Sequence, residues 1–148
     1  KMELSRSLHH VKGNCFWPAN EIVWNTDGIA DSLQEHYHKT PALIPAYTHM
    51  HNGRPKKIAS PRAERTEKGY TVKWFARGDR KDPRNPQYFV IYRFLPGQKI
   101  DLNNPDNIAA ITRYTECYIP NKKLKCRYVI TAVDRFHNES KGKRIKGM

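Results

Sequence analysis

A change in the hydrophobic period near residue 56 is the feature that most constrains how this chain can fold. Downstream of that point, apolar and polar residues alternate with a period of two, which is the pattern of a half-buried strand. Turn residues separate seven short segments of this kind: residues 58–65, 70–75, 88–95, 108–112, 116–120, 126–135 and 141–145. Short strands at such regular spacing predict a mainly β domain, a seven-stranded antiparallel sandwich, over residues 56–148.

The alternation also predicts which side chains face the core of this sandwich. The inward positions are Trp74 on the second strand, Tyr88, Val90 and Tyr92 on the third, and Tyr128, Ile130 and Ala132 on the sixth. Tyr128 occupies a tyrosine-corner position, in which a buried ring directs its hydroxyl to the backbone. Pro61 has no N–H to donate to a neighbouring strand, so the first strand is predicted to lie at a sheet edge.

Residues 1–55 lack the elements of a self-sufficient domain. Residues 13–24 predict a short buried strand and a loop, and residues 29–39 predict an amphipathic helix capped by Thr26 or Asp27. Residues 41–55 contain three prolines and predict an extended linker. One strand and one helix cannot enclose a core, so we expect the remnant of the last βα unit of a larger α/β domain.

The start at KMELSR, without an initiator Met or a leader, also suggests a piece of a longer chain. Apolar residues exposed in such a remnant would favour self-association: Phe16, Trp17, Ile22 and Trp24.

The positive charge is concentrated in the second part of the chain. Residues 1–55 carry five Lys/Arg and five Asp/Glu, whereas residues 56–148 carry 22 Lys/Arg and nine Asp/Glu, so the formal net charge of +13 arises there. Candidate contacts for a polyanion are Lys122, Lys123, Lys125, Arg127, Lys141, Lys143, Arg144 and Lys146. This excess of positive charge could form a solvated basic face. It could also serve to bind an anionic glycan, acidic lipid or an acidic neighbouring domain. Nucleic acid is disfavoured as a partner, because the aromatic residues are predicted to lie in the core.

The sequence carries no cofactor motif and no membrane span. It contains no GxGxxG, P-loop or GxSxG pattern and no run of eighteen apolar residues. Cys15, Cys117 and Cys126 lack zinc spacing and are expected to be small buried residues, with a Cys117–Cys126 bridge left open. The pairs His36/His38 and His49/His51 fall on a helix end and in a linker, so we expect them to serve structure and not a metal.

Five stretches of the sequence, taken in chain order, resemble the C-terminal end of bacterial glycosyl-hydrolase-like family 10 proteins. These stretches are GNCFW, DGIADSLQEHYHKTPALIP, YFVIYRF, KIDLNNPDNIAAITR and YVITAVDRFHNES, which together span nearly the whole chain. The resemblance implies that residues 1–55 end a TIM-barrel domain and that residues 56–148 form a fibronectin type III-like module. It also implies a parent enzyme that hydrolyses glycosidic bonds and lies outside the cytoplasm, as a periplasmic, secreted or lipoprotein form.

The resemblance gives this chain no catalytic residue. Glycosidases generally use two carboxylates that flank the scissile bond, and those of a barrel come from several strands. Glu21 and Asp27 follow the predicted strand, but no second strand supplies a partner carboxylate. Trp17 and Trp24 are the candidates for contact with the substrate of the parent enzyme.

We therefore expect a non-catalytic accessory module that packs against its barrel and aids attachment to a carbohydrate or cell surface. The alternative is an independent module that binds polyanions through its basic residues. A third interpretation, an intact small enzyme, is disfavoured because no acid and base are paired.

Overall fold

The chain forms two compact units, Lys1–Pro41 and Ala42–Met148. The structure is a computed structural model and describes residues 2–11, 13–56, 58–76, 81–120 and 125–148. Packing of the second unit therefore begins at Ala42, upstream of the predicted domain start at Lys56. The assignment of residues 1–55 to a barrel stays a prediction.

The first unit consists of short helical segments without a buried residue. They are α1 (Met2–Ser7), α2 (Ala19–Val23), a 3₁₀ turn (Thr26–Gly28), α3 (Ile29–Ser32) and a π-helical turn (Leu33–Tyr37). The strand predicted over residues 13–24 is wrong, because Ala19–Val23 is helical and Phe16 is half-buried at most. A strand needs a neighbour to pair its backbone groups, and the first described strand of the chain begins only at Ile58.

The predicted helix over residues 29–39 forms, but its cap differs from the prediction. Asn25, with φ of 53°, accepts hydrogen bonds at its Oδ1 from the backbone N–H groups of Ala30 (2.8 Å) and Asp31 (3.3 Å). Its Nδ2 also donates to the Asp31 carboxylate at 2.8 Å. Asn25 thus replaces Thr26 and Asp27 as the residue that satisfies the free N–H groups of the first turn.

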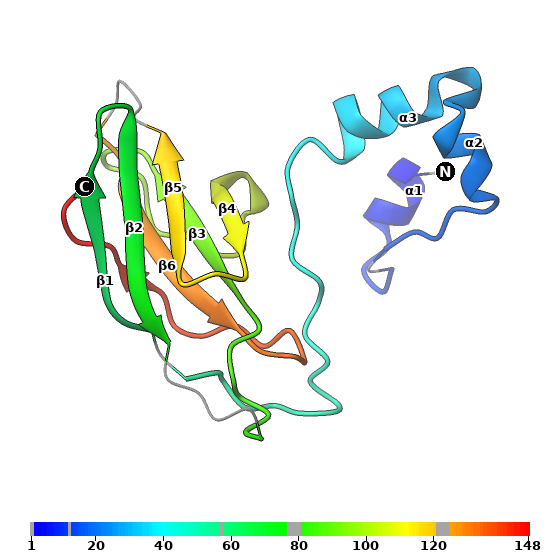
Figure 1. The fold of residues 1–148 in the computed structure, drawn as a ribbon. Helices are drawn as coiled ribbons and strands as arrows, with labels where there is room; N and C mark the ends of the chain where they lie inside the picture. The colour runs from blue at the N-terminus through cyan, green and yellow to red at the C-terminus, as the bar shows by residue number, and fades with distance from the viewer. Residues whose placement is uncertain (1, 12, 57, 77–80, 121–124) are drawn as a thin grey trace. The chain divides into compact units, whose positions relative to one another are not determined.

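The second unit is a β-sandwich, as predicted. One sheet has the order β1-β2-β5 and the other the order β4-β3-β6-β7, and neighbouring strands are antiparallel. The strands are β1 (Ile58–Arg65), β2 (Gly69–Ala76), β3 (Tyr88–Phe94), β4 (Ile108–Thr112), β5 (Glu116–Pro120), β6 (Arg127–Val133) and β7 (Lys143–Arg144), with a 3₁₀ turn at Pro105–Asn107. Figure 1 shows β1, β2 and β5 in front of the second sheet. The strand β1 lies at a sheet edge, which confirms the expectation drawn from Pro61.

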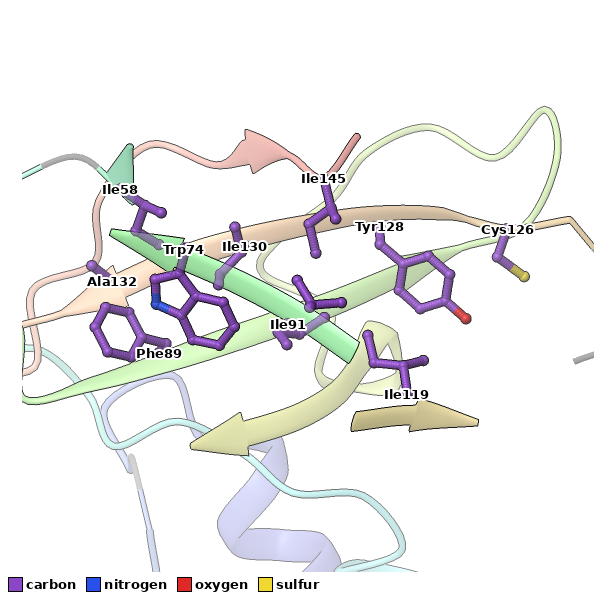
Figure 2. Packing of buried hydrophobic residues seen from close by; sticks show 11 residues of the cluster. Ile58, Trp74, Phe89, Ile91, Ile119, Cys126, Tyr128, Ile130, Ala132 and Ile145 are labelled. Atoms are coloured by element: carbon purple, nitrogen blue, oxygen red, sulfur yellow. The ribbon is translucent and has the colours of Figure 1, made fainter. Parts of the chain in front are cut away.

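The core between the sheets is built from alternate residues of facing strands. Trp74 packs edge-on against Phe89 with ring centroids 5.2 Å apart, and Ile91, Ile130 and Ala132 surround them (Figure 2). Tyr128 is buried in the same cluster, so the prediction of a buried ring is confirmed. The predicted inward positions of β6 and Trp74 are therefore correct.

The predicted orientation of β3 is wrong. Phe89 and Ile91 point into the space between the sheets, whereas Val90 and Tyr92 belong to a second cluster on the outer face. This outer cluster consists of Val90, Tyr92, Phe94, Val129 and Val133, and is covered by Leu43, Tyr88, Leu102 and Ile108. Because both faces of YFVIYRF are apolar, alternation alone could not orient the strand.

The cysteines are free thiols. Cys126 is buried and Cys117 is half-buried, but Cys15 is exposed, which contradicts its expected burial. The bridge left open between Cys117 and Cys126 is not formed. Burial raises the pKa of the Cys117 thiol, which reduces its reactivity. Within the described ranges, no helix is long and apolar enough to cross a membrane.

Replacing Trp74 tests this account of the core. We expect Trp74→Ala to lower the free energy of unfolding by about 3–5 kcal/mol, because it opens a cavity against Phe89. Trp74→Phe should cost markedly less, since the buried indole N–H has no hydrogen-bond partner to lose. Phe75→Ala is the matched control, because the Phe75 ring is 72% exposed on the next residue; its effect should stay within about 0.5 kcal/mol. Urea denaturation followed by circular dichroism measures all three, and equal losses for Trp74→Ala and Phe75→Ala would contradict the assignment.

Candidate functional site

Residues 42–56, which we call the docked segment, are bound along the sandwich. Leu43 packs against the outer cluster of the second sheet. The Tyr47 N–H donates to the Phe136 carbonyl at 2.8 Å, and the His51 carbonyl accepts a 2.9 Å bond from the Asn138 side chain. At the end of the segment, the Lys56 Nζ lies 3.0 Å from the Asp82 carboxylate. The region predicted as an extended linker is therefore part of the second unit.

The loop from β6 to β7 receives the docked segment and is organised by Asp134. This carboxylate is fully buried. Its Oδ1 accepts from the backbone N–H groups of Phe136 (2.8 Å) and Asn138 (2.9 Å), and its Oδ2 accepts from the Asn138 Nδ2 at 3.2 Å. The turn places His137 in the left-handed region with φ of 61°. The loop thus presents the Phe136 carbonyl and the Asn138 amide to the docked segment.

A second polar group, centred on Glu139, lies under the loop. Its Oε1 accepts from the Tyr92 hydroxyl at 2.7 Å and from the Thr131 hydroxyl at 2.6 Å. Burial and the bond to Glu139 raise the pKa of Tyr92 well above its usual range. The Tyr88 hydroxyl lies 3.2 Å from the Nδ1 of His137, and burial together with the charge of Glu139 raises the pKa of Tyr88. Saturated by two hydroxyl donors, the Glu139 oxygen serves as a structural acceptor.

Two shallow hollows follow the docked segment. The first, of about 370 Å³, is lined by residues that include Leu43, Pro45, His137 and Glu139. The second, of about 380 Å³, shares His137 and adds Tyr88 and Arg113. Of the described residues that line them, Glu139 alone carries a carboxylate. A second carboxylate to complete the pair used for glycoside hydrolysis is not among these lining residues.

The two candidate substrate-contact residues, Trp17 and Trp24, lie in the first unit. The side chain of Trp17 is 91% exposed and that of Trp24 is 72% exposed. Their indole rings are thus open to solvent in this chain. The role of either ring in contacting a substrate stays a prediction.

Six of the eight candidate basic residues lie in the part of the chain that the structure describes, and their joint binding of a polyanion stays a prediction. Lys122 and Lys123 lie outside the described residues, and Lys125 and Lys141 are exposed. The Arg127 guanidinium donates to the Gln98 carbonyl. Lys143 pairs with Ile130 and Arg144 with Val129, so these two side chains point to opposite faces of the sheet edge.

The histidine pairs belong to no larger group of potential metal ligands in the part of the chain that the structure describes. There, no group of three or more His, Cys, Asp or Glu side chains is close enough to hold an ion. His51 instead packs against Phe136 with ring centroids 5.5 Å apart. His36 lies beside Tyr37 in the π-helical turn, with ring centroids 6.5 Å apart.

The sequence interpretation missed Asp134, Glu139 and the hydroxyls that bond them. It placed Tyr92 in the core between the sheets. The available signal was Asp134, a residue that favours an Asx turn, directly after an apolar strand.

Asn138→Asp tests the fastening of the docked segment. The new carboxylate would lie near Asp134 Oδ2, where Asn138 Nδ2 lies at 3.2 Å, and it could not donate to the His51 carbonyl. We expect a loss of about 2–4 kcal/mol in unfolding free energy at neutral pH, which shrinks as the pH falls and one carboxyl of the pair takes up a proton. Asn52→Asp, an exposed residue of the docked segment, is the control. Equal, pH-independent effects of both variants in urea denaturation would contradict this role of Asn138.

Two buried tyrosines and one half-buried tyrosine predict how stability falls at alkaline pH. Burial is the largest cause that raises the pKa values of Tyr88, Tyr92 and Tyr128 above the ordinary value. Groups with a raised folded-state pKa contribute stability that is complete below about pH 10 and is lost as the pH rises through the folded-state pKa. Titration followed by tyrosinate absorbance should show these three ionising last of the eight tyrosines, together with unfolding. A single ionisation step with the fold intact would contradict this result.

Comparisons with known proteins relate the chain to a glycosyl hydrolase. No family model matches the sequence, and no solved structure matches it. The glycosyl hydrolase YngK of Bacillus subtilis (strain 168) is 28% identical over 152 aligned residues, which cover 97% of this chain. The chain spans only 28% of the length of that protein. The similarity across nearly the whole chain supports a glycosyl-hydrolase-related protein.

Proposed function

We propose that this chain is the C-terminal part of a glycosyl-hydrolase-like family 10 enzyme and that its sandwich is a non-catalytic accessory module. In this proposal the first unit, Lys1–Pro41, ends a TIM barrel, and the second unit is a fibronectin type III-like domain that includes the docked segment. The parent protein hydrolyses O-glycosidic bonds of a polysaccharide outside the cytoplasm. The similarity to YngK over 97% of the chain supports the relation to a hydrolase.

The docked segment is the observation that carries the accessory role. Residues that follow the first unit are bound to the sandwich by Leu43, by the Tyr47 N–H and by the Lys56–Asp82 ion pair. The side chain and the backbone N–H of Arg84 also donate to the Asp82 carboxylate. Together with the bond from Lys56, these hydrogen bonds hold the pKa of Asp82 well below its usual range. Because the docked segment is bound to the sandwich, the flexible linker between the module and the preceding domain is shorter. A short linker suits a module that keeps a fixed position on its enzyme.

The two carboxylates of the loop from β6 to β7 support a structural role for this end of the sandwich. Hydrolysis of a glycosidic bond by the common mechanisms needs two carboxyl groups that are about 5–9.5 Å apart and open to the substrate. Asp134 is fully buried and bonded within its own loop, and Oε1 of Glu139 accepts from the hydroxyls of Tyr92 and Thr131. Both carboxylates therefore stabilise the fold.

The polyanion-binding alternative rests on the charge of residues 56–148. All of the net +13 arises there. Arg127 is engaged with the Gln98 carbonyl, however, and Lys143 and Arg144 point to opposite faces. This arrangement favours the accessory role over a single basic binding surface.

The natural full-length protein that contains this chain provides the test. We expect deletion of residues 42–148 to lower the thermal midpoint of the barrel, while this chain alone hydrolyses no glycoside. Leu43→Asp in the full-length protein should also lower the midpoint, because it places a charge against the apolar outer cluster. Ile44→Asp is the matched control, because Ile44 directly follows Leu43 and its side chain is largely exposed. Hydrolysis by this chain alone, or a barrel indifferent to the deletion, would contradict the proposal.

A further inference from the structure

The outer face of the β1-β2-β5 sheet carries aromatic and charged side chains. Val72 and Trp74 point into the core, so the alternate residues of β2, Thr71, Lys73 and Phe75, point outward. Glu116 and Tyr118 on β5 point outward by the same argument, since Cys117 and Ile119 pack inward. Arg62 and Glu64 face them from β1, in register with Lys73 and Thr71. All seven residues therefore belong to one surface, which we call the β2 face.

Two aromatic rings on the β2 face are open to solvent. The Phe75 side chain is 72% exposed and that of Tyr118 is 51% exposed. Tyr118 is paired with Thr71, which lies four residues from Phe75 on the same strand. At about 3.4 Å per residue, the two ring positions lie roughly 14 Å apart along the sheet. The separation suits an elongated ligand that contacts both rings.

A hollow at the Phe75 end of this face is lined by polar groups of both kinds. Its volume is about 340 Å³, and its lining includes Phe75, Lys73, Glu64, Arg62, Glu116 and Thr115. The Lys73 Nζ lies 2.8 Å from Glu64 Oε2, and this hydrogen bond raises the pKa of Lys73. Both groups of this pair remain largely exposed, which leaves their other donor and acceptor positions open to a ligand.

The charge balance of the hollow indicates a neutral, hydroxyl-rich ligand. Arg62 and Lys73 supply two cations, and Glu64 and Glu116 supply two anions. An anion would gain from the first pair and be repelled by the second, so net attraction is small. A sugar hydroxyl both donates and accepts, and charged partners form the stronger hydrogen bonds. An exposed ring beside such groups can also stack on the C–H face of a sugar, since the ring face is negative and C–H groups are weakly positive.

We infer that the β2 face binds an uncharged polysaccharide, with Phe75 and Tyr118 as stacking platforms and the Lys73–Glu64 pair as hydroxyl partners. The inference deepens the proposed function, because it assigns the glycan attachment of an accessory module to a specific surface. It differs from the polyanion alternative in both location and charge. It concerns aromatic rings of the sandwich, in addition to the candidates Trp17 and Trp24 of the first unit.

Affinity electrophoresis of this whole chain tests the inference. Gels would each contain one soluble uncharged polysaccharide, namely hydroxyethylcellulose, glucomannan or xylan backbone lacking acidic groups, with polygalacturonate as the charged counterpart. We expect at least one uncharged polymer to retard the chain and Phe75→Ala to weaken that binding by about tenfold. Phe75→Trp should strengthen binding through its larger ring, a gain that misfolding cannot mimic. Val23→Ala is the control, because this apolar residue is 78% exposed in the other unit, and it should leave retardation unchanged.

Three results would overturn the inference: no retardation by any uncharged polymer, equal retardation of Phe75→Ala and the natural sequence, or retardation by polygalacturonate alone. If Phe75→Ala instead lowers the thermal midpoint of the full-length protein without any glycan binding, the β2 face is a protein contact and the inference is wrong. The proposed function is judged separately, by the effect of deleting residues 42–148 and by the lack of hydrolysis. A module that stabilises its barrel but binds no uncharged glycan would lose only this inference.

Discussion

Burial of β3 and β6 on both faces is the constraint on which the rest of the second unit depends. Their inner residues meet β2 and β5 across the sandwich, while Tyr92 and Val129 lie in the outer cluster. Such a sheet cannot leave its outer face in water without exposing a large apolar surface. Leu43 and the 3₁₀ region near Ile108 cover it, so residues upstream of the first strand become part of the fold.

Polar contacts then fix where this cover lies. Apolar packing is not directional, whereas the Phe136 carbonyl and the Asn138 amide bond specific atoms of Tyr47 and His51. Asp134 holds both of these loop groups in place. The buried Asp134 carboxylate therefore stabilises the fold. The two outer faces of the sandwich differ. One is covered by the chain itself, and the other exposes Phe75 and Tyr118.

The sequence predicted the parts of the fold that depend on local pattern. All the predicted strands of the sandwich form, Trp74 and Ile130 are buried as expected, and β1 lies at an edge. The orientation of β3 was not predictable in this way, because both of its faces are apolar. Long-range contacts distinguish them, with Trp74 on the inner face and residues such as Leu43 on the outer face. The strand predicted near Phe16 failed for a related reason, since its pairing partners are not among the described strands. Glu139 bonds Tyr92, which lies 47 positions earlier in the chain, and Thr131, which lies eight positions earlier. No local pattern encodes contacts of this kind.

The central claim is that the docked segment belongs to the folded sandwich. Native-state hydrogen exchange at the Tyr47 amide tests it most directly, because this N–H donates to the Phe136 carbonyl at 2.8 Å. The account predicts that the Tyr47 amide is protected by several orders of magnitude and loses protection in Leu43→Asp, while the amides of β6 remain protected. Exchange of the Tyr47 amide at the rate of an unstructured peptide, in the natural sequence and with the sandwich intact, would contradict the account.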